Sequence, residues 1–137
     1  MADARPPLVA ELVWSGELRF DASSGASTTV VDGDGKFGPS PMQHAAVGLA
    51  GCMAADVVDI LRKGRHPLTA FRATFTGERA PEPPRRFTKI DLTFEIQGAV
   101  PVEAIERAIA LSREKYCSVL HTFRQDIPVT VSFEIKP

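Results

Sequence analysis

The chain has 137 residues, of which 44% are hydrophobic, and its net charge at pH 7 is −1. This length and hydrophobic content suit one domain with its own core, so we predict a single domain over residues 1–137. The charge gives no long-range attraction to nucleic acid or anionic lipid, and no basic cluster is interleaved with aromatic residues. We therefore expect no nucleic-acid partner.

Cysteine usage and the N-terminal segment bear on the compartment. The two cysteines are too few for a disulfide scaffold. The segment MADARPPLVAE lacks the apolar run of a signal peptide. We expect a cytoplasmic protein whose thiols start reduced, so that a disulfide would form as redox chemistry rather than as a structural support.

The first part of the chain predicts three short strands and a loop. Residues 8–20 hold β-forming residues on both sides of Ser15-Gly16, which is typical of two strands joined by a turn or bulge. A turn at 23–25 leads to a third strand over 28–31. The segment 32–39, DGDGKFGP, predicts a loop. It lacks the spacing and terminal Glu of an EF-hand, so we expect no calcium there.

The strongest prediction is one long helix from Ser40 to Gly64. Ser40 suits the N-cap, Pro41 the first helical position, and Gln43 the reciprocal position of a capping box. Gly64 follows the last turn, where a left-handed residue usually ends a helix. The signals at the two ends agree.

The interior of this helix has no charged residue from 41 to 55. A helix that is apolar all round is expected to be buried. The uncharged run is shorter than the ~20 residues that cross a bilayer, so we expect no membrane span. Gly48 and Gly51 each cost about 1 kcal/mol of helix propensity relative to Ala, which indicates that another backbone packs closely there. Cys52 lies beside these glycines.

The second half of the chain predicts two strands, two helices and a last strand. Alternating apolar residues over 68–76 and 87–97 indicate a long hairpin. Pro101 begins a helix, 118–125 forms a short one, and 129–135 alternates again. The predicted order is βββ-α-ββ-αα-β, an α+β fold in which antiparallel sheet covers the helices.

The cysteines are the first candidates for chemistry, and each has two interpretations. Cys52 is either a small buried hydrophobic residue or a reactive thiol. Cys117 directly precedes the short helix, where unpaired amides and the helix dipole favour a thiolate. Only the fold can bring the two together, because they lie far apart in the sequence.

Charged and imidazole side chains add weaker candidates. Arg19 alternates with Leu18 and Phe20, so it faces either solvent or a thiolate whose charge it stabilises. Asp56 and Asp59 mark the point where the helix meets water or a basic partner. No close-spaced metal-ligand pair occurs among the cysteines and the three histidines, so we expect no metal. The histidines are His44, His66 and His121.

Two motifs resemble the OsmC/Ohr family of osmotically induced and organic-hydroperoxide-resistance proteins. They are SPMQHAAVGLAGCM, residues 40–53, and EKYCSV, residues 114–119. Within the family the chain is most similar to the YhfA-like branch, through Trp14 and Gly16, the KGR segment 63–65 and the RxFTxIxLxF pattern over 85–94. The likeness covers essentially the whole chain.

The resemblance implies an intertwined homodimer with active sites at the subunit interface. It also implies a thiol peroxidase that reduces organic hydroperoxides in the oxidative-stress response. Cys52 would become a sulfenic acid, Cys117 would close a disulfide with it, and an external dithiol or lipoylated reductant would reopen the bond. No other cofactor is implied.

The resemblance also implies an activating Arg and Glu, and here the sequence departs from the pattern. Arg19 is the candidate for the arginine, whereas the glutamate position of the hydroperoxide-reducing branch holds Met42. Gln43 and Glu114 are possible supporting residues. Two alternatives therefore stay open: a thiol redox sensor or small-ligand-binding dimer without peroxidase activity, and a structural dimer with buried cysteines.

Overall fold

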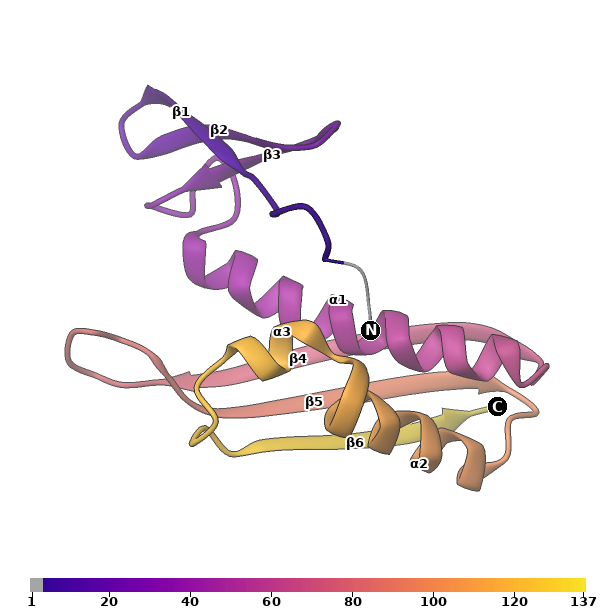
Figure 1. Ribbon diagram of the computed structural model, residues 1–137. Coiled ribbons are helices and arrows are strands. Elements are labelled where there is room, and N and C mark those ends of the chain that lie inside the picture. The colour runs from indigo at the N-terminus through magenta and orange to yellow at the C-terminus, as the bar shows by residue number, and fades with distance from the viewer. Residues whose placement is uncertain (1–3) are drawn as a thin grey trace. The chain divides into compact units, whose positions relative to one another are not determined.

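The computed structural model describes residues 4–137, and their elements follow the predicted order (Figure 1). Contacts divide the chain into two compact units, one ending at Ala45 and one beginning at Ala46. The elements are β1 (Glu11–Gly16), β2 (Arg19–Ser24), β3 (Ser27–Asp32), α1 (Pro41–Lys63), β4 (Leu68–Arg79), β5 (Phe87–Gly98), α2 (Val102–Leu111), the π-helical turn η1 (Ser112–Tyr116), α3 (Ser118–Thr122) and β6 (Val129–Lys136). The α+β class is confirmed. The single domain over 1–137 stays a prediction.

The first unit contains an antiparallel sheet of three strands in the order β1-β2-β3. The predicted irregularity at Ser15-Gly16 is confirmed, because the register shifts between Trp14 and Gly16. The chain reverses after it, at Glu17, with φ values of 122° at Gly16 and 49° at Glu17. Glycine tolerates this left-handed conformation without a Cβ clash. The turn therefore directs β2 back along β1.

Helix α1 is capped at its start as predicted. The Ser40 amide donates to Gln43 Oε1 at 2.8 Å, and the Gln43 amide donates to Ser40 Oγ at 3.2 Å, which completes a capping box. The helix end differs from the prediction by one residue. Arg65, not Gly64, takes the left-handed conformation, with φ 61°.

The end of α1 is a Schellman motif. The amide of His66 donates to the Leu61 carbonyl and the amide of Arg65 donates to the Arg62 carbonyl. These two bonds satisfy carbonyl groups that the last helical turn leaves unpaired. In this geometry the residue that needs positive φ is Arg65, and glycine stands one position too early to supply it.

The second unit contains a mixed sheet in the order β4-β5-β6. β4 and β5 form the predicted antiparallel hairpin, but β6 runs parallel to β5, so the prediction of purely antiparallel sheet is wrong here. The reason is the connection. Helices α2 and α3 carry the chain back to the end of the sheet at which β5 begins, as a crossover between parallel strands requires.

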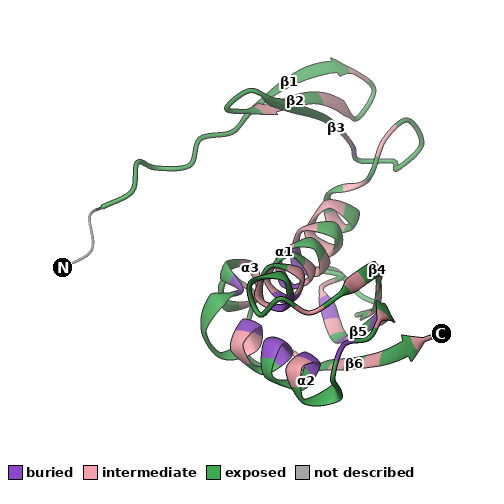
Figure 2. Cartoon of the chain, turned by 90° about the vertical axis from the view of Figure 1, so that its right-hand side faces the viewer, coloured by how far each residue is buried: buried purple, intermediate pink, exposed green. Residues whose placement is uncertain are grey.

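Helices and sheet of the second unit form two layers around one core. Figures 1 and 2 show α2, α3 and the second-unit part of α1 on one face of the sheet. Every second residue of β5 is buried against that face, and α1 buries one stripe with a four-residue spacing. The buried residues are Ile90, Leu92, Phe94 and Ile96 on β5 and Leu49, Met53, Val57 and Leu61 on α1.

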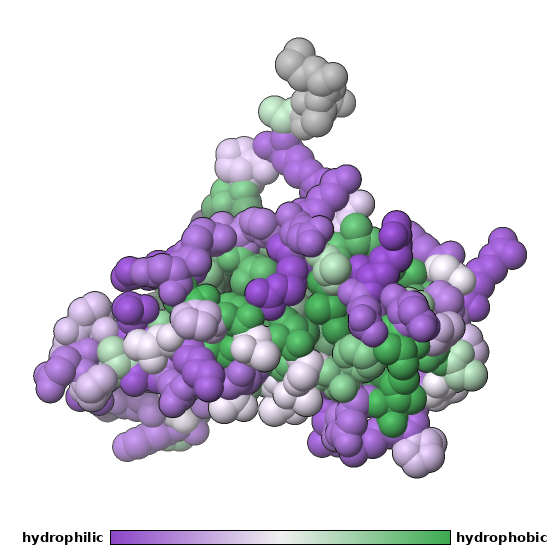
Figure 3. All heavy atoms as spheres, turned by 90° about the horizontal axis from the view of Figure 1, so that it is seen from below, coloured by the Kyte–Doolittle hydropathy of each residue, from purple (hydrophilic) through white to green (hydrophobic). Residues whose placement is uncertain are grey.

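The rest of α1 is not buried in this chain, which differs from the expectation of a helix buried all round. Val47 is 67% exposed, and a Cβ placed on Gly48 or Gly51 would meet no described atom within 4 Å apart from its chain neighbours and the nearby backbone of the same helix. Figure 3 shows further hydrophobic side chains among hydrophilic ones at the surface. Helix α1 is long and apolar enough to span a membrane. Core helices of soluble proteins pass the same test, so its length and composition are weak evidence for a membrane span.

Candidate active site

Cys52 lies near the middle of α1 and is partly buried. Its neighbour Met53 points into the core and has no exposed surface. Asp56 follows one helical turn after Cys52, and residues four apart lie on the same side of an α-helix. The helix therefore presents a thiol and a carboxylate together.

Cys117 is placed by an irregular helix end. After α2 the chain widens into the π-helical turn η1, and the Cys117 amide donates to the Ser112 carbonyl at 2.9 Å. Cys117 leaves the helix in an extended conformation and becomes the N-cap of α3, where its Sγ accepts the Leu120 amide at 3.4 Å. Its side chain is fully buried. Short π-helical segments are frequent at functional sites.

These elements bring the two predicted cysteines together. Cys52 Sγ, Cys117 Sγ and a carboxylate oxygen of Asp56 all lie within 4.8 Å of one another, and both cysteines are free. A disulfide needs sulfur atoms about 2.05 Å apart. The two free thiols are therefore neighbours in the fold, as a disulfide between them would require.

The electrostatics of Cys117 contradict one expectation. Burial raises the pKa of its thiol to about 11, and the Leu120 amide that favours the thiolate opposes this only in part. Interaction with Cys52 and the charge of Asp56 raise the pKa further. The helix position favours a thiolate through the Leu120 amide, as expected, but the net effect is the opposite, because the cost of burying the charge exceeds the gain from one amide.

Asp56 and Ser112 are the site residues that the sequence did not reveal. Ser112 is fully buried, and its hydroxyl donates to Asp56 Oδ2 at 2.8 Å. Asp56 was expected where the helix meets water or a basic partner; it is partly buried and accepts this hydroxyl. Asp59 does pair with a basic residue, Lys63, at 2.8 Å. The four-residue spacing from Cys52 to Asp56 was the available signal.

The cluster also has the donor types of a metal site. Two thiols and a carboxylate are ligands that zinc accepts, and in the described residues they form the one such group of three or more. Exposed acidic groups often lie near other donors without a metal. The expectation that no metal binds stays a prediction.

Arg19 lies in the first unit, on β2, opposite Asp32 on β3. Its guanidinium stacks 4.5 Å from the centroid of the Phe37 ring, and its Nε is buried without a hydrogen-bond partner among the described residues. The amides of Phe37 and Asp34 lower the pKa of the Asp32 carboxyl, which also accepts the Lys36 amide. These bonds order the predicted loop and hold Phe37 against Arg19. The approach of Arg19 to a thiolate stays a prediction.

The other predicted candidates have different surroundings. Gln43 is engaged in the capping box of α1, and Glu114 is exposed on η1. His44 is a partly buried helix residue as expected, with Nε2 2.9 Å from the Val30 carbonyl oxygen. His121 Nε2 lies 2.9 Å from the Arg113 carbonyl oxygen. None of these is part of the three-residue cluster.

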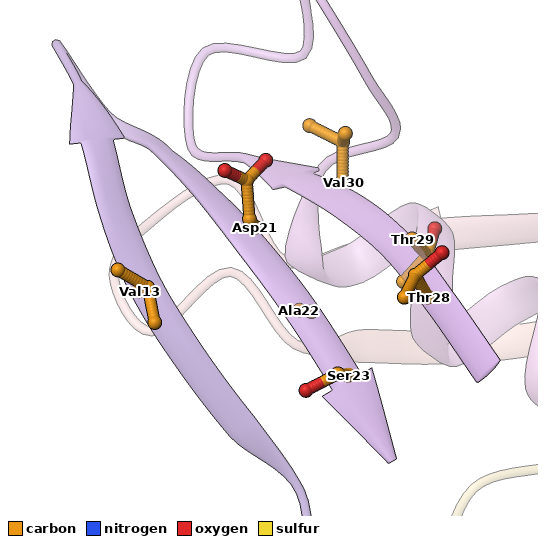
Figure 4. Close-up of a pocket in the computed structure, with 7 residues that line it drawn as sticks. All are labelled: Val13, Asp21, Ala22, Ser23, Thr28, Thr29 and Val30. Carbon is orange, nitrogen blue, oxygen red and sulfur yellow. The ribbon is translucent and has the colours of Figure 1, made fainter. Parts of the chain in front are cut away.

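The first sheet carries a separate hollow of about 390 Å³ (Figure 4). All three strands line it, and Asp21 is its one ionisable group. The lining residues are Val13, Asp21, Ala22, Ser23, Thr28, Thr29 and Val30. It holds no thiol, so it is a weaker candidate than the dithiol.

Comparison with known proteins agrees with the fold. The family model described as OsmC-like protein matches residues 33–132. The chain belongs to this family. It is 37% identical over 129 residues to protein YhfA of Escherichia coli K12, covering 92% of this chain and 96% of YhfA.

Solved structures superpose on the chain. A hypothetical protein from Aquifex aeolicus VF5 has a TM-score of 0.89 at 28% identity, covering 96% of this chain and 98% of that one. An organic hydroperoxide resistance protein from Legionella pneumophila has a TM-score of 0.69 at 18% identity, covering 96% and 99%. The second likeness is one of fold.

Proposed function

We propose that this OsmC-like chain is a cysteine-dependent hydroperoxide reductase in which Cys52 reacts with the peroxide and Cys117 resolves the product. The observation that carries the proposal is the pair of free thiols within 4.8 Å, built by elements far apart in the sequence. Membership in the family supports a redox role in stress. A structural role alone gives no reason to place two thiols together beside a carboxylate.

The different burial of the two cysteines assigns their roles. Cys52 retains exposed surface, whereas Cys117 is fully buried and holds its proton. The Cys52 thiolate attacks one peroxide oxygen, the O–O bond breaks, and the departing alkoxide takes a proton to become an alcohol. Cys52 is then a sulfenic acid. Cys117 condenses with it, water leaves, and a dithiol or lipoylated reductant reopens the disulfide.

Activation of the thiolate is assigned to Arg19. A cation beside Cys52 would stabilise the thiolate and the charge on the departing oxygen. Arg19 supports this role by its buried Nε without a partner, since such an atom is costly unless a group arrives to accept its hydrogen bond. Met42 cannot replace the family glutamate, so we expect slower turnover than in members that keep it. Gln43 and Glu114 are kept as supporting candidates.

We also propose a homodimer in the cytoplasm. The open space above Gly48 and Gly51 and the exposure of Val47 leave a face of α1 that a second copy would cover. The same contact would account for two glycines in a helix interior. The peroxide and the reductant are the remaining partners, with no nucleic acid and no membrane.

A thiol redox sensor is the second candidate. The observation that favours it is Met42 at the glutamate position. A sensor would oxidise once and wait, whereas a peroxidase turns over. Repeated consumption of cumene hydroperoxide with dihydrolipoate as reductant supports the peroxidase, and a single equivalent consumed supports the sensor.

The deciding experiment counts thiols by mass spectrometry before and after one equivalent of cumene hydroperoxide. We expect wild type to lose two thiols, Cys117→Ser to hold a sulfenic acid at Cys52, and Cys52→Ser to leave the peroxide unconsumed. Survival of both thiols in wild type would rule out peroxide as the substrate. Peroxide consumption that persists in Cys52→Ser would remove the assigned nucleophile.

A further inference from the structure

We propose that Asp56 is the proton acceptor of the resolving step and that Ser112 holds it in place. The proposal rests on the proposed function, because it concerns how Cys117 attacks the Cys52 sulfenic acid. It names the group that accelerates a step the two thiols alone perform slowly. It also gives a role to the carboxylate of the three-residue cluster.

The geometry places Asp56 beside both reacting sulfur atoms. Its carboxylate oxygen lies within 4.8 Å of the Sγ atoms of Cys52 and Cys117. Ser112 links the two, since its hydroxyl donates to Asp56 Oδ2 at 2.8 Å and its carbonyl accepts the Cys117 amide at 2.9 Å. The fully buried Ser112 thus fixes the Asp56 carboxylate and the Cys117 backbone relative to each other.

The chemistry of Cys117 requires such an acceptor. Burial raises the pKa of its thiol to about 11, so at pH 7 roughly one molecule in ten thousand carries the thiolate. The thiolate, not the thiol, attacks sulfur. A carboxylate next to the thiol can remove the proton as the S–S bond forms, which is general base catalysis.

The step balances in atoms and electrons. The S–H bond of Cys117 breaks and its proton moves to the Asp56 carboxylate. The electron pair left on Cys117 forms the bond to Cys52 Sγ, and the S–O bond of the sulfenic acid breaks with its pair on oxygen. The hydroxide takes the proton from Asp56 and leaves as water. Cys117 is oxidised, the Cys52 sulfur is reduced, and Asp56 is a carboxylate again.

Other titratable side chains near Cys117 have other partners or face solvent. They are Arg113, Glu114, Lys115 and Tyr116 on η1, His121 on α3 and Lys63 at the end of α1. Arg113 Nη1 donates to the Val129 carbonyl and His121 Nε2 lies near the Arg113 carbonyl oxygen. Glu114, Lys115 and Tyr116 are exposed, and Lys63 pairs with Asp59. Among the described side chains, the carboxylate placed beside the Cys117 thiol is therefore that of Asp56.

The test follows disulfide formation after one equivalent of cumene hydroperoxide, with no reductant and with a chelator present. Acid-quenched samples are analysed by mass spectrometry for the Cys52 sulfenic acid and for the disulfide. Asp56→Asn removes the base at nearly constant shape, and Asp56→Glu keeps a carboxylate. Asp59→Asn is the matched control, because Asp59 is an exposed aspartate on the same helix with its own partner Lys63.

We expect Asp56→Asn to slow conversion of sulfenic acid to disulfide about 100-fold at pH 7, as loss of a general base does. The deficit should shrink as pH rises toward 11, where Cys117 ionises without help. Asp56→Glu should recover part of the rate and Asp59→Asn should match wild type. Ser112→Ala should slow the step several-fold with the same pH signature, and it keeps the test decisive if Asp56→Asn fails to fold.

The direction in which Asp56→Asn changes the rate of disulfide formation distinguishes a general base from a group that acts only by its charge. The negative charge of Asp56 raises the pKa of Cys117, so removal of a mere charge would favour the thiolate and speed disulfide formation. Normal Cys52 oxidation followed by an unchanged or faster step in Asp56→Asn would overturn the role of Asp56 alone. No oxidation of Cys52 in wild type would overturn the proposed function and this inference together.

Discussion

The two units of this chain treat hydrophobic side chains in opposite ways. In the second unit, the inward residues of β5 are fully buried beneath the helices. In the first unit, Leu12, Val13 and Trp14 on β1 are 53%, 65% and 67% exposed. A three-stranded sheet needs a covered hydrophobic face for independent stability. The second unit has a buried hydrophobic core. The first unit has hydrophobic residues that could form one, but those of β1 are exposed.

The candidate site residues are also divided between the two units. Both thiols, Asp56 and Ser112 belong to the unit with the closed core, so the groups of the proposed disulfide step are held by elements that are already packed. The candidate activating residue, Arg19, belongs to the unit with the exposed sheet. In the proposed mechanism, disulfide formation therefore depends on the better-packed unit, and thiolate activation depends on the unit whose sheet is exposed.

The largest expected effect tests this contrast directly. Phe94 is fully buried, with its ring centroid 5.0 Å from that of Phe71. Phe94→Ala should lower the free energy of unfolding by about 3–5 kcal/mol, because it removes a large side chain and leaves a cavity. Trp14→Ala should cost less than about 1 kcal/mol in the uncovered sheet. Urea melts of the two variants measure the difference.

A loss for Trp14→Ala as large as for Phe94→Ala would break the comparison. It would show that something covers β1 in solution. A concentration dependence of that loss would identify the cover as a second copy, because dissociation of a dimer follows mass action. Equal, small losses for both variants would instead contradict the closed core of the second unit.

Local patterns predicted the elements well because each rests on neighbouring residues. The capping box needs only Ser40 and Gln43, and the strand alternation needs only its own segment. The parallel pairing of β5 with β6 was missed, since strand direction depends on where the crossover helices return the chain. These helices pack by tertiary contacts that no local pattern records.

The site was predicted in part for the same reason. The motifs indicated both cysteines, but the partner of Asp56 is Ser112, a residue on a distant π-helical turn. The protonation of the Cys117 thiol could not be predicted, because the sequence shows the helix that favours a thiolate and not the burial that opposes it. Long-range packing decided both points.

Burial of Cys117 in the second unit should make the stability of the chain depend on pH. The pKa of Cys117 is raised by burial from 9.0 to about 11. Between these values the folded chain holds a proton that the unfolded chain has lost. The stabilisation is complete below pH 9 and is lost as pH rises through 11. It amounts to roughly 2–3 kcal/mol.

Urea melts in reductant at pH 8 and pH 11 measure this loss. Other groups also titrate in this range, so the informative quantity is the difference between wild type and Cys117→Ala. Cys52→Ala retains the buried thiol but loses its interaction with Cys52, so its pH dependence should fall between those of wild type and Cys117→Ala. Equal pH dependence in wild type and Cys117→Ala would show that Cys117 is not held as a buried neutral thiol.

The smallest effect concerns α1, the helix that begins in the first unit and ends in the second. Side chains cap its start, whereas its end relies on Arg65 in a left-handed conformation with φ 61°. That conformation places the Cβ of an L-residue too close to a carbonyl oxygen, and glycine avoids the clash. Arg65→Gly should therefore stabilise the chain by about 0.5–1 kcal/mol.

Arg62→Gly makes the same chemical change three residues earlier, inside the last exposed turn, and should destabilise it by about 1 kcal/mol. Thermal melts of the two variants should shift in opposite directions, and a shift of both to lower temperature would mean that Arg65 contributes a contact worth more than its backbone strain.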